Sequence, residues 1–214
     1  MMYVSQITLD KAAASGRRLY GLYEWHQEAW RLFPGRTRDK RDFLTRLDAG
    51  EKDLRFTVLS VVKPQKPDWC VPAQWREKEL TESFFGQSRY LFKVTVNPTR
   101  TLSYRDPTGN KKKNGSHYAI TKQDELKAWI TRKAEQGGFL VCDEPQLEIL
   151  PPVFHRLYKA DKKTQKEYEG GIVGVEFKGA LEVKNTEVFL KTVKEGIGRA
   201  KGFGFGLFIL KPIA

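Results

Sequence analysis

The order of the hydrophobic patterns in the second half of the chain is the feature that most constrains its fold. Residues Tyr90 to Val96 alternate apolar with polar side chains, which predicts a strand with one buried face. Apolar residues then recur at helical spacing from about Lys122 to Gln136, before the stop signal Gly137-Gly138. Further strands are predicted at Phe139 to Cys142, Glu148 to Tyr158 and Gly171 to Val183, followed by a helix at Thr186 to Glu195 and a strand at Phe203 to Leu210.

The β-α-β-β-α-β order of these elements is the split βαβ pattern of the ferredoxin-like fold. The first half repeats it less clearly, with a strand at Tyr3 to Leu9, a helix from about Arg17 to Phe33, strands at Phe43 to Leu47 and Arg55 to Val62, and a short polar helix near Trp75 to Ser83. A chain of 214 residues can hold two such units. We therefore predict an α+β protein with two tandem ferredoxin-like (RRM-like) domains, residues 1–87 and 88–214.

The charge balance indicates a polyanionic partner. Lys and Arg number 38 against 26 Asp and Glu, and the net charge of +12 attracts polyanions by its field and by counterion release. Nucleic acid is the leading candidate. An anionic membrane is the alternative, but no stretch approaches the roughly 18 apolar residues of a spanning helix, and no basic amphipathic anchor opens the chain.

Several other classes of protein are poorly supported by the sequence. The N-terminus from Met1 to Ile7 lacks the basic start and apolar run of a secretory signal, so we expect a cytoplasmic protein. Cys70 and Cys142 stand far apart and predict neither a zinc site nor a disulfide. His117 and His155 have no partners at metal-ligand spacing, and the sequence has neither a compact carboxylate cluster nor a phosphate-binding loop of the P-loop type. We expect neither a metal ion nor another cofactor.

Glycine is concentrated near the C-terminal end, where five of the chain's 18 glycines fall between residues 196 and 206. Glycines allow a backbone to approach RNA phosphates closely, and Arg199 and Lys201 would add cationic donors. A tight turn that packs a helix against a terminal strand explains the same glycines equally well. The composition of the segment leaves both explanations open.

Lys201 to Phe208 matches the RNP1 pattern of RNA-recognition motifs except at Gly206, where valine is expected. RNP1 lies on the third strand of its domain, so a further helix and strand must follow it, but only six residues follow Phe208. The match therefore does not indicate an ordinary RNA-recognition motif. We expect Phe203 and Phe205 to face the core from the terminal strand.

Tyr23 and His26 lie three residues apart on the first predicted helix and therefore share one of its faces. His26 also falls on the apolar stripe, so it is either a packed histidine at the edge of the core or a functional group. In a ribonuclease, a base takes the proton of a 2′-hydroxyl, the oxygen attacks the adjacent phosphorus and an acid protonates the leaving 5′-oxygen. Histidine suits both steps because it titrates near neutrality. Tyr23 could orient the ribose or phosphate, and Arg31 could stabilise charge on the phosphorane.

A family resemblance extends through the chain in five blocks. They are Leu22 to Pro34 (LYEWHQEAWRLFP), Arg41 to Leu44 (RDFL), Val96 to Pro98 (VNP), Ala128 to Lys133 (AWITRK) and Gly196 to Lys201 (GIGRAK). In these blocks, and in their order, the chain resembles the CasE family, the repeat-processing endoribonucleases of type I-E CRISPR Cascade complexes. The segment Gly204 to Phe208 is more aromatic than the family pattern, which leaves open an extra RNA contact on the last strand.

The resemblance implies a pair of ferredoxin-like domains and cleavage of CRISPR repeat RNA at the 3′ base of its stem-loop. The products would be a 2′,3′-cyclic phosphate and a 5′-hydroxyl, formed without a metal ion, and the processed RNA would stay bound for assembly with other Cascade subunits. His26 and Tyr23 occupy the positions that match the family's catalytic residues. Arg31 falls where a basic residue assists in some relatives.

Two basic segments complete the predicted RNA-binding surface. The predicted hairpin that follows Phe154 matches the region that family members lay against the RNA stem. The full set of predicted RNA-binding residues is Arg156, Lys159, Lys162, Lys163, Arg199, Lys201, Lys111, Lys112 and Lys113. The lysines of the hairpin and of the 111–113 loop could instead belong to solvated charge runs.

Two alternatives to an enzyme stay open at this point. A non-catalytic RNA-binding module would account for the charge, the glycine-rich segment and the basic hairpin, with His26 as a core residue. A structural Cascade subunit would use the same basic surface to hold its guide RNA. We expect a monomer in isolation under all three interpretations.

Overall fold

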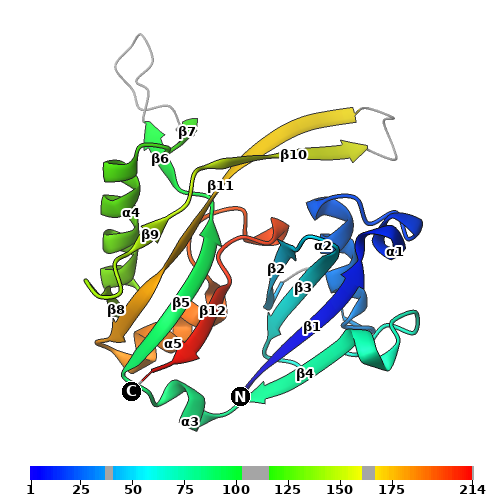
Figure 1. Ribbon diagram of the computed structural model, residues 1–214, viewed down its shortest axis with the longest axis horizontal. Helices are drawn as coiled ribbons and strands as arrows, with labels where there is room; N and C mark the ends of the chain where they lie inside the picture. Colours follow the sequence, from blue (N-terminus) through cyan, green and yellow to red (C-terminus); the bar gives the residue numbers. More distant parts are fainter. Residues whose placement is uncertain (37–40, 103–115, 161–166, 214) are drawn as a thin grey trace.

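Two antiparallel sheets lie side by side in the computed structural model, which describes residues 1–36, 41–102, 116–160 and 167–213 (Figure 1). The first half of the chain contains β1 (Met2–Asp10), α1 (Lys11–Gly16), α2 (Leu22–Arg31), β2 (Phe43–Ala49), β3 (Asp53–Ser60), the 3-10 helix η1 (Pro72–Gln74), β4 (Trp75–Leu80) and α3 (Glu82–Phe85). The second half contains β5 (Arg89–Val96), β6 (Thr99–Leu102), β7 (Ser116–Ala119), α4 (Gln123–Gln136), β8 (Phe139–Val141), β9 (Glu148–Ile149), β10 (Val153–Ala160), β11 (Glu167–Val183), α5 (Thr186–Glu195), the 3-10 helix η2 (Lys201–Phe203) and β12 (Phe208–Pro212).

Both sheets have the strand order of a ferredoxin-like fold. The first runs β2-β3-β1-β4 and the second β10-β11-β5-β12, and their neighbouring strands are antiparallel. If β8, β9 and β10 are taken as one interrupted strand, each sheet places the first strand of its half between the third and the fourth, as the β-α-β-β-α-β order requires. In the first half, η1 stands where the second helix would be. The predicted α+β fold of two tandem ferredoxin-like units is confirmed, and the boundary between residues 87 and 88 stays a prediction.

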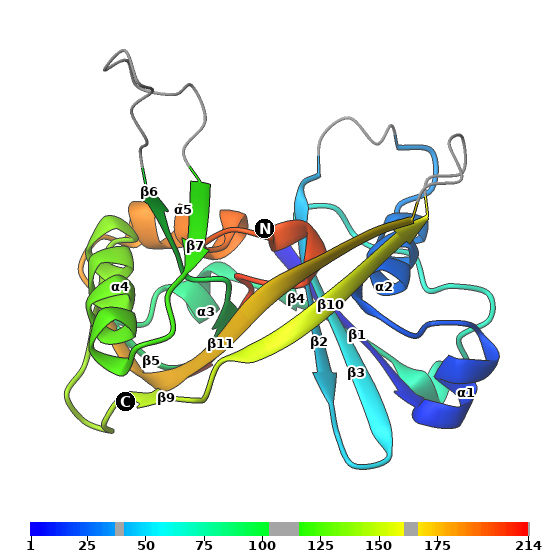
Figure 2. The ribbon, with the colours of Figure 1, turned by 90° about the horizontal axis from the view of Figure 1, so that it is seen from above.

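The longest described strand, β11, has 17 residues and organises the second sheet. One of its edges pairs with β5, and the other pairs in turn with β8, β9 and β10. Pro151 and Pro152 separate β9 from β10, because proline cannot donate the hydrogen bond that a continuous ladder needs. The strand predicted over residues 148–158 is therefore two strands. Beyond the sheet, β10 and β11 extend as a ribbon toward α2, which β10 contacts (Figure 2).

The first sheet contributes side chains to a hydrophobic core on each of its faces. Because side chains alternate along a strand, neighbouring residues of one strand enter different cores. Phe43 on β2 packs with α1 and α2 in one core, whereas Leu44 beside it belongs to the core of the second half. Phe56 and Leu59 on β3 are divided in the same way. The second half therefore packs directly on the first sheet, opposite the helices.

The helix that carries the candidate catalytic residues is shorter than predicted. We expected it to begin near Arg17, but Arg18 has a left-handed backbone with φ 59°, and α2 begins only at Leu22. The Gly21 backbone N–H donates a hydrogen bond of 2.9 Å to the Glu24 carboxylate, which fixes the start of α2. The periodic apolar residues before this point belong to the turn between α1 and α2.

Two segments differ in type from the prediction. Residues Trp75–Leu80 form the edge strand β4, which pairs with β1, instead of a polar helix. Only the two ends of this strand are partly buried, so its sequence carries little hydrophobic alternation. The last strand begins at Phe208 instead of Phe203, because Gly204 and Gly206 have φ values of 88° and 87°, outside the strand region.

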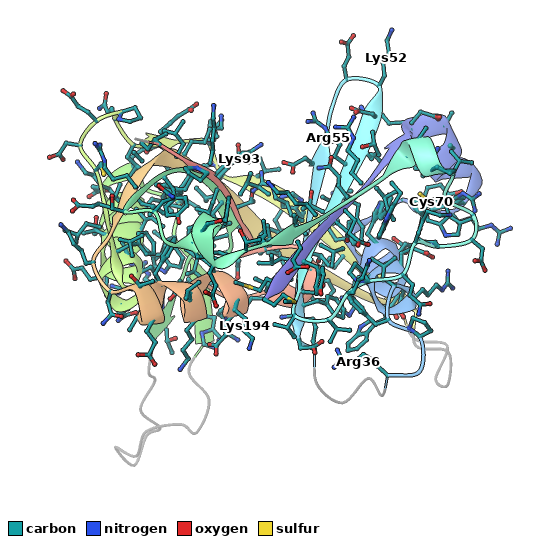
Figure 3. The ribbon with its side chains drawn as sticks, turned by 90° about the horizontal axis from the view of Figure 1, so that it is seen from below. Arg36, Lys52, Arg55, Cys70, Lys93 and Lys194 are labelled. Atoms are coloured by element: carbon teal, nitrogen blue, oxygen red, sulfur yellow. The ribbon has the colours of Figure 1, made fainter. Side chains whose placement is uncertain are left out.

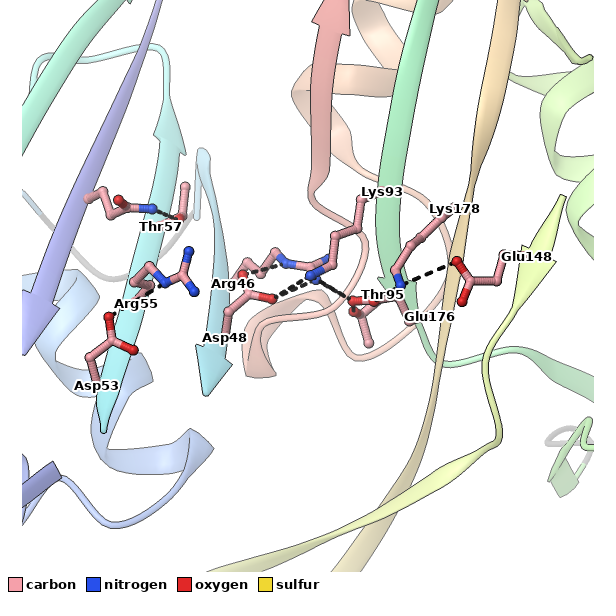
Figure 4. A network of polar contacts seen from close by, with 11 residues as sticks. Arg46, Asp48, Asp53, Arg55, Thr57, Lys93, Thr95, Glu148, Glu176 and Lys178 are labelled. Atoms are coloured by element: carbon pink, nitrogen blue, oxygen red, sulfur yellow. Dashed lines mark hydrogen bonds and ion pairs between the residues drawn. The ribbon is translucent and has the colours of Figure 1, made fainter. Parts of the chain in front are cut away.

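A buried arginine joins the two sheets through two carboxylates (Figure 4). Arg46 on β2, with 3% of its side chain exposed, donates two hydrogen bonds of 2.7 Å to Asp48 and pairs with Glu176 on β11 at 2.5 Å. Lys93 on β5 lies 3.2 Å from Asp48 and 3.3 Å from Glu176. Thr95 donates a further hydrogen bond to Glu176. Burial raises the pKa of both carboxyl groups, but the hydrogen bonds and charges of Arg46 and Lys93 outweigh it and hold both pKa values below their usual range.

Arg46→Ala should leave two partly buried carboxylates without their main partner. We expect the free energy of unfolding to fall by about 3–5 kcal/mol, the usual loss when one partner of a buried ion pair is removed. Urea unfolding measures the change. Arg55→Ala is the matched control, because Arg55 on β3 is half exposed and lies 3.7 Å from Asp53 (Figure 3), an arrangement worth about 0–1 kcal/mol. Equal losses in the two variants would contradict a bridging role for Arg46.

Acid should weaken the same contact between the sheets. Because the pKa values of Asp48 and Glu176 are lower in the folded chain, their stabilisation is complete above the ordinary carboxyl pKa of about 4 and is lost as the pH falls through the folded-state values. We expect Glu176→Gln to lose less stability than the unaltered protein between about pH 7 and about pH 3. Urea unfolding at each pH gives both slopes, and identical slopes would exclude this source of acid sensitivity.

Candidate active site

The face of α2 that carries His26 is connected to a buried aromatic cluster through Trp30. The indole Nε1–H of Trp30 donates a hydrogen bond of 3.2 Å to Nε2 of His26. Since an indole nitrogen only donates, the imidazole nitrogen is the acceptor, and the ring is neutral in this contact. The Trp30 ring packs edge-on against Phe43 of β2, with centroids 4.9 Å apart. Trp30 therefore holds the imidazole in place from the side of the core.

The two other candidate catalytic residues of α2 differ in their relation to His26. Tyr23 is partly buried one turn before it, so the structure brings these two side chains to one face, as the spacing predicts. Arg31 is five residues further along and therefore about 140° around the helix from His26. Its side chain is 66% exposed and forms an ion pair with the buried Glu28. The structure does not bring Arg31 beside the histidine.

The glycine-rich segment approaches α2 from the second half of the chain, where η2 contacts both α2 and β2. The ring of Phe203 lies 6.1 Å, centroid to centroid, from the imidazole of His26. A β-carbon at Gly202 would sit 3.9 Å from Cε1 of His26 and 2.9 Å from Nη1 of Arg41. The absence of a side chain at residue 202 therefore lets the Arg41 guanidinium lie close to the turn, beside the imidazole. The expectation that Phe203 faces the core from a strand is wrong, whereas Phe205 is buried as expected.

Positive φ values at four glycines set the path of this segment, at Gly196, Gly198, Gly204 and Gly206. The Ile197 N–H donates to the Gly206 carbonyl at 3.2 Å, and the Gly206 N–H donates to the carbonyl of Thr95 on β5 at 2.7 Å. The segment is thus a tight turn between α5 and the last strand, β12. This was one of the two explanations that the sequence left open. The close approach of RNA phosphates stays a prediction.

Gly206→Ala should destabilise the turn that carries η2. Its φ of 87° disfavours a side chain, and the new β-carbon would meet the Ile197 carbonyl oxygen at 2.4 Å, so we expect a loss of about 1–3 kcal/mol in the free energy of unfolding. Gly16→Ala is the control, because no atom lies within 4 Å of its added carbon and alanine favours the end of α1 by up to about 1 kcal/mol. Urea unfolding compares the two, and a Gly206→Ala protein as stable as the control would contradict the strained turn.

Cationic side chains gather near Gly202. Burial lowers the pKa of Arg41, which is half-buried just before β2. Burial also lowers the pKa of Lys201, and the charges of Arg41 and Lys133 lower it further against the opposing effect of Glu195. Because these cations repel one another, an anion bound between them would be stabilised.

The other predicted RNA-binding residues lie at the margins of this site or outside the described residues. Arg156 is exposed on β10, the strand that contacts α2. Arg199 is exposed, and its backbone bridges Asn97 at the end of β5. Lys159 belongs to β10, but its side chain is outside the described part of the chain. The predicted residues Lys162, Lys163, Lys111, Lys112 and Lys113 also lie outside it.

Arg41 and Trp30 lie at the site without having been predicted there. Trp30 fits the apolar stripe of its helix, and Arg41 stands among other charged residues, so neither pattern points to the histidine. Both fall within blocks of the family resemblance, Leu22 to Pro34 and Arg41 to Leu44. That resemblance is the signal that could have found them.

The remaining chemistry of the described residues is limited. Within the described ranges, no three His, Cys, Asp or Glu side chains come together in a way that could hold a metal ion. Cys70 is buried and Cys142 partly buried, and both are free thiols. No described helix is long and apolar enough to cross a membrane.

Comparisons with known proteins identify the family. The model of the family described as CRISPR associated protein matches residues 2–212, so the chain belongs to that family, and the resemblance found in the sequence is confirmed. The CRISPR-associated endoribonuclease Cse3 of Thermus thermophilus is 26% identical over 224 residues, which cover 99% of this chain and 100% of that protein. The CRISPR system Cascade subunit CasE of Escherichia coli K12 is 26% identical over 218 residues, again 99% and 100% of the two chains. A solved structure of CRISPR endoribonuclease Cse3 bound to a 19-nucleotide RNA matches with a TM-score of 0.77 at 24% identity, over 98% of this chain and 100% of that one.

Proposed function

We propose that this chain is a metal-independent endoribonuclease that binds the stem-loop of CRISPR repeat RNA and cleaves the precursor at the 3′ base of the stem. The observation that carries the proposal is the neutral imidazole of His26, which accepts a hydrogen bond from Trp30 and lies beside Gly202. The name of the Thermus thermophilus relative, an endoribonuclease that matches over the whole chain, supports the same activity.

In the proposed reaction, the 2′-hydroxyl at the cut site replaces the Trp30 indole as the donor to Nε2 of His26. The hydroxyl proton passes to the imidazole, the 2′-oxygen bonds to the adjacent phosphorus, and the bond from phosphorus to the 5′-oxygen breaks. A proton from the imidazolium or from solvent passes to that 5′-oxygen, which leaves a 2′,3′-cyclic phosphate and a 5′-hydroxyl. The imidazole is neutral again once it has given up its proton to the 5′-oxygen or to solvent. Acid–base catalysis of this kind contributes about 10²–10⁴-fold to the rate.

Two further residues of α2 have proposed roles in this reaction. Tyr23, on the same face as His26, orients the ribose or the phosphate through its hydroxyl group. Arg31 supplies positive charge to the phosphorane, and it must leave its ion pair with Glu28 to do so. We therefore expect a smaller contribution from Arg31 than from His26.

The basic ribbon of β10 and β11 would hold the stem while α2 holds the cut site. Arg156 is exposed on β10 and β10 contacts α2, so RNA that follows the ribbon arrives at the histidine. Further phosphate contacts are proposed for Lys159, Lys162, Lys163, Arg199, Lys201, Lys111, Lys112 and Lys113. The product would stay bound in the cytoplasm for assembly with other Cascade subunits, in line with the name of the Escherichia coli relative.

A cleavage assay in EDTA on the host's repeat RNA tests the proposal, beside a matched RNA without the 2′-hydroxyl at the cut site. We expect cleavage of the normal RNA alone. His26→Ala should lower the single-turnover rate constant by about 10²–10⁴-fold and keep the dissociation constant of the deoxy RNA within about tenfold. His117→Ala is the matched control, because His117 is exposed on β7 and its imidazole contacts Thr101.

Two outcomes would contradict this proposal in different ways. Binding without cleavage of either RNA would exclude the enzyme and favour a non-catalytic RNA-binding module or a structural Cascade subunit. Cleavage that appears only when a divalent ion is added would exclude the metal-independent mechanism.

A further inference from the structure

Arg41 occupies a position from which a guanidinium can reach a phosphate beside His26. It stands two residues before β2, and its Nη1 atom lies 2.9 Å from the point that a β-carbon on residue 202 would occupy. Cε1 of His26 lies 3.9 Å from the same point. Because Gly202 has no side chain, the guanidinium can approach the turn this closely, with the imidazole beside it.

The Arg41 guanidinium is partly desolvated, and no described carboxylate forms an ion pair with it. Its Nε atom is buried and has no hydrogen-bond partner among them, and none of their ion pairs includes Arg41. Burial lowers the pKa of Arg41, and its charge contributes to the lowered pKa of Lys201. An incompletely solvated cation beside other cations is unfavourable, and a bound anion offsets that cost.

We propose that Arg41 binds the phosphate at the cut site and stabilises the negative charge that builds on it during cleavage. This inference rests on the proposed ribonuclease function and identifies a cation for its transition state. A guanidinium can donate two parallel hydrogen bonds to phosphate oxygens, whereas an ammonium acts as a point charge. Donors aimed at a developing oxyanion in a partly dry site lower the barrier more than they strengthen binding of the ground state.

Two other arginines nearby are less suited to this role. Arg31 is mostly exposed and is paired with Glu28. Arg36, at the surface in the segment that leads to Arg41, is paired with Asp42 and has 39% of its side chain exposed (Figure 3). Arg36 therefore provides a matched control, with the same charge in the same part of the chain.

Single-turnover cleavage of the repeat RNA by Arg41→Gln, Arg41→Lys and Arg36→Gln tests the inference. Arg41→Gln should slow cleavage by about 10²–10³-fold, the usual effect of removing one donor to a developing oxyanion. Arg41→Lys keeps the charge without the fork and should recover only part of this loss. Arg36→Gln should cleave at the unaltered rate. The dissociation constant of the deoxy RNA should stay within about tenfold for every variant, and thermal unfolding shows whether each is folded.

Gly202→Ala provides a second test that leaves the arginine present. Its methyl group must displace the Arg41 guanidinium, 2.9 Å away, but meets His26 at an ordinary contact distance of 3.9 Å. We expect this variant to slow cleavage by about tenfold or more when Arg41 is present, and to add nothing in the Arg41→Gln background, because effects that act through one contact are not additive.

The results that would overturn the role of Arg41 differ from those that would overturn the proposed ribonuclease function. If Arg41→Gln cleaves as fast as Arg36→Gln, or if Gly202→Ala slows both backgrounds equally, the inference is overturned and the ribonuclease stands. If Arg41→Gln does not fold, Arg41→Lys takes its place, both in the comparison with Arg36→Gln and as the background for Gly202→Ala. The same results would then overturn the inference. Intact RNA after incubation with the unaltered protein would overturn the proposed function, and the role of Arg41 with it.

Discussion

The guanidinium of Arg46 has lost nearly all of its hydration at the contact between the two sheets, and Asp48 and Glu176 together offset that cost. Asp48 belongs to the same strand, but Glu176 is on β11 of the other sheet. The second carboxylate therefore reaches Arg46 only when the two halves dock in this orientation. In that orientation η2 contacts α2 and β2, so we expect the distance between His26 and the glycine-rich turn to depend on this buried ion pair.

Strand β2 connects this contact to the candidate site. On one face, Phe43 packs against Trp30, whose indole positions the histidine. On the other face, Leu44 enters the core of the second half and Arg46 forms the ion pairs with Glu176. Apolar packing tolerates small shifts, whereas the hydrogen bonds of a buried guanidinium are directional. The alternation of one strand thus couples the orientation of the halves to the orientation of the imidazole.

Elements that bury one face of their own were predictable from sequence, as the alternation over Tyr90 to Val96 shows for β5. Strand β4 was not predictable, because an exposed edge strand takes its structure from pairing with β1 and needs no hydrophobic pattern. At the site, helical spacing placed His26 and Tyr23 on one face and left a packed and a catalytic histidine both open, and the family resemblance favoured the catalytic one. Arg41 and Gly202 are far apart in sequence and approach each other only when the two halves dock. No local sequence pattern could therefore predict this contact.

The two sides of the site are made at different times during translation. Helix α2, with its histidine, is complete early in synthesis, whereas η2 follows the last long strand of the second sheet. A nascent chain that has only its first half presents the histidine without the facing turn and without the second sheet that orients it. The arrangement of His26, Arg41 and Gly202 therefore forms only after the second half of the chain has been made and has docked on the first.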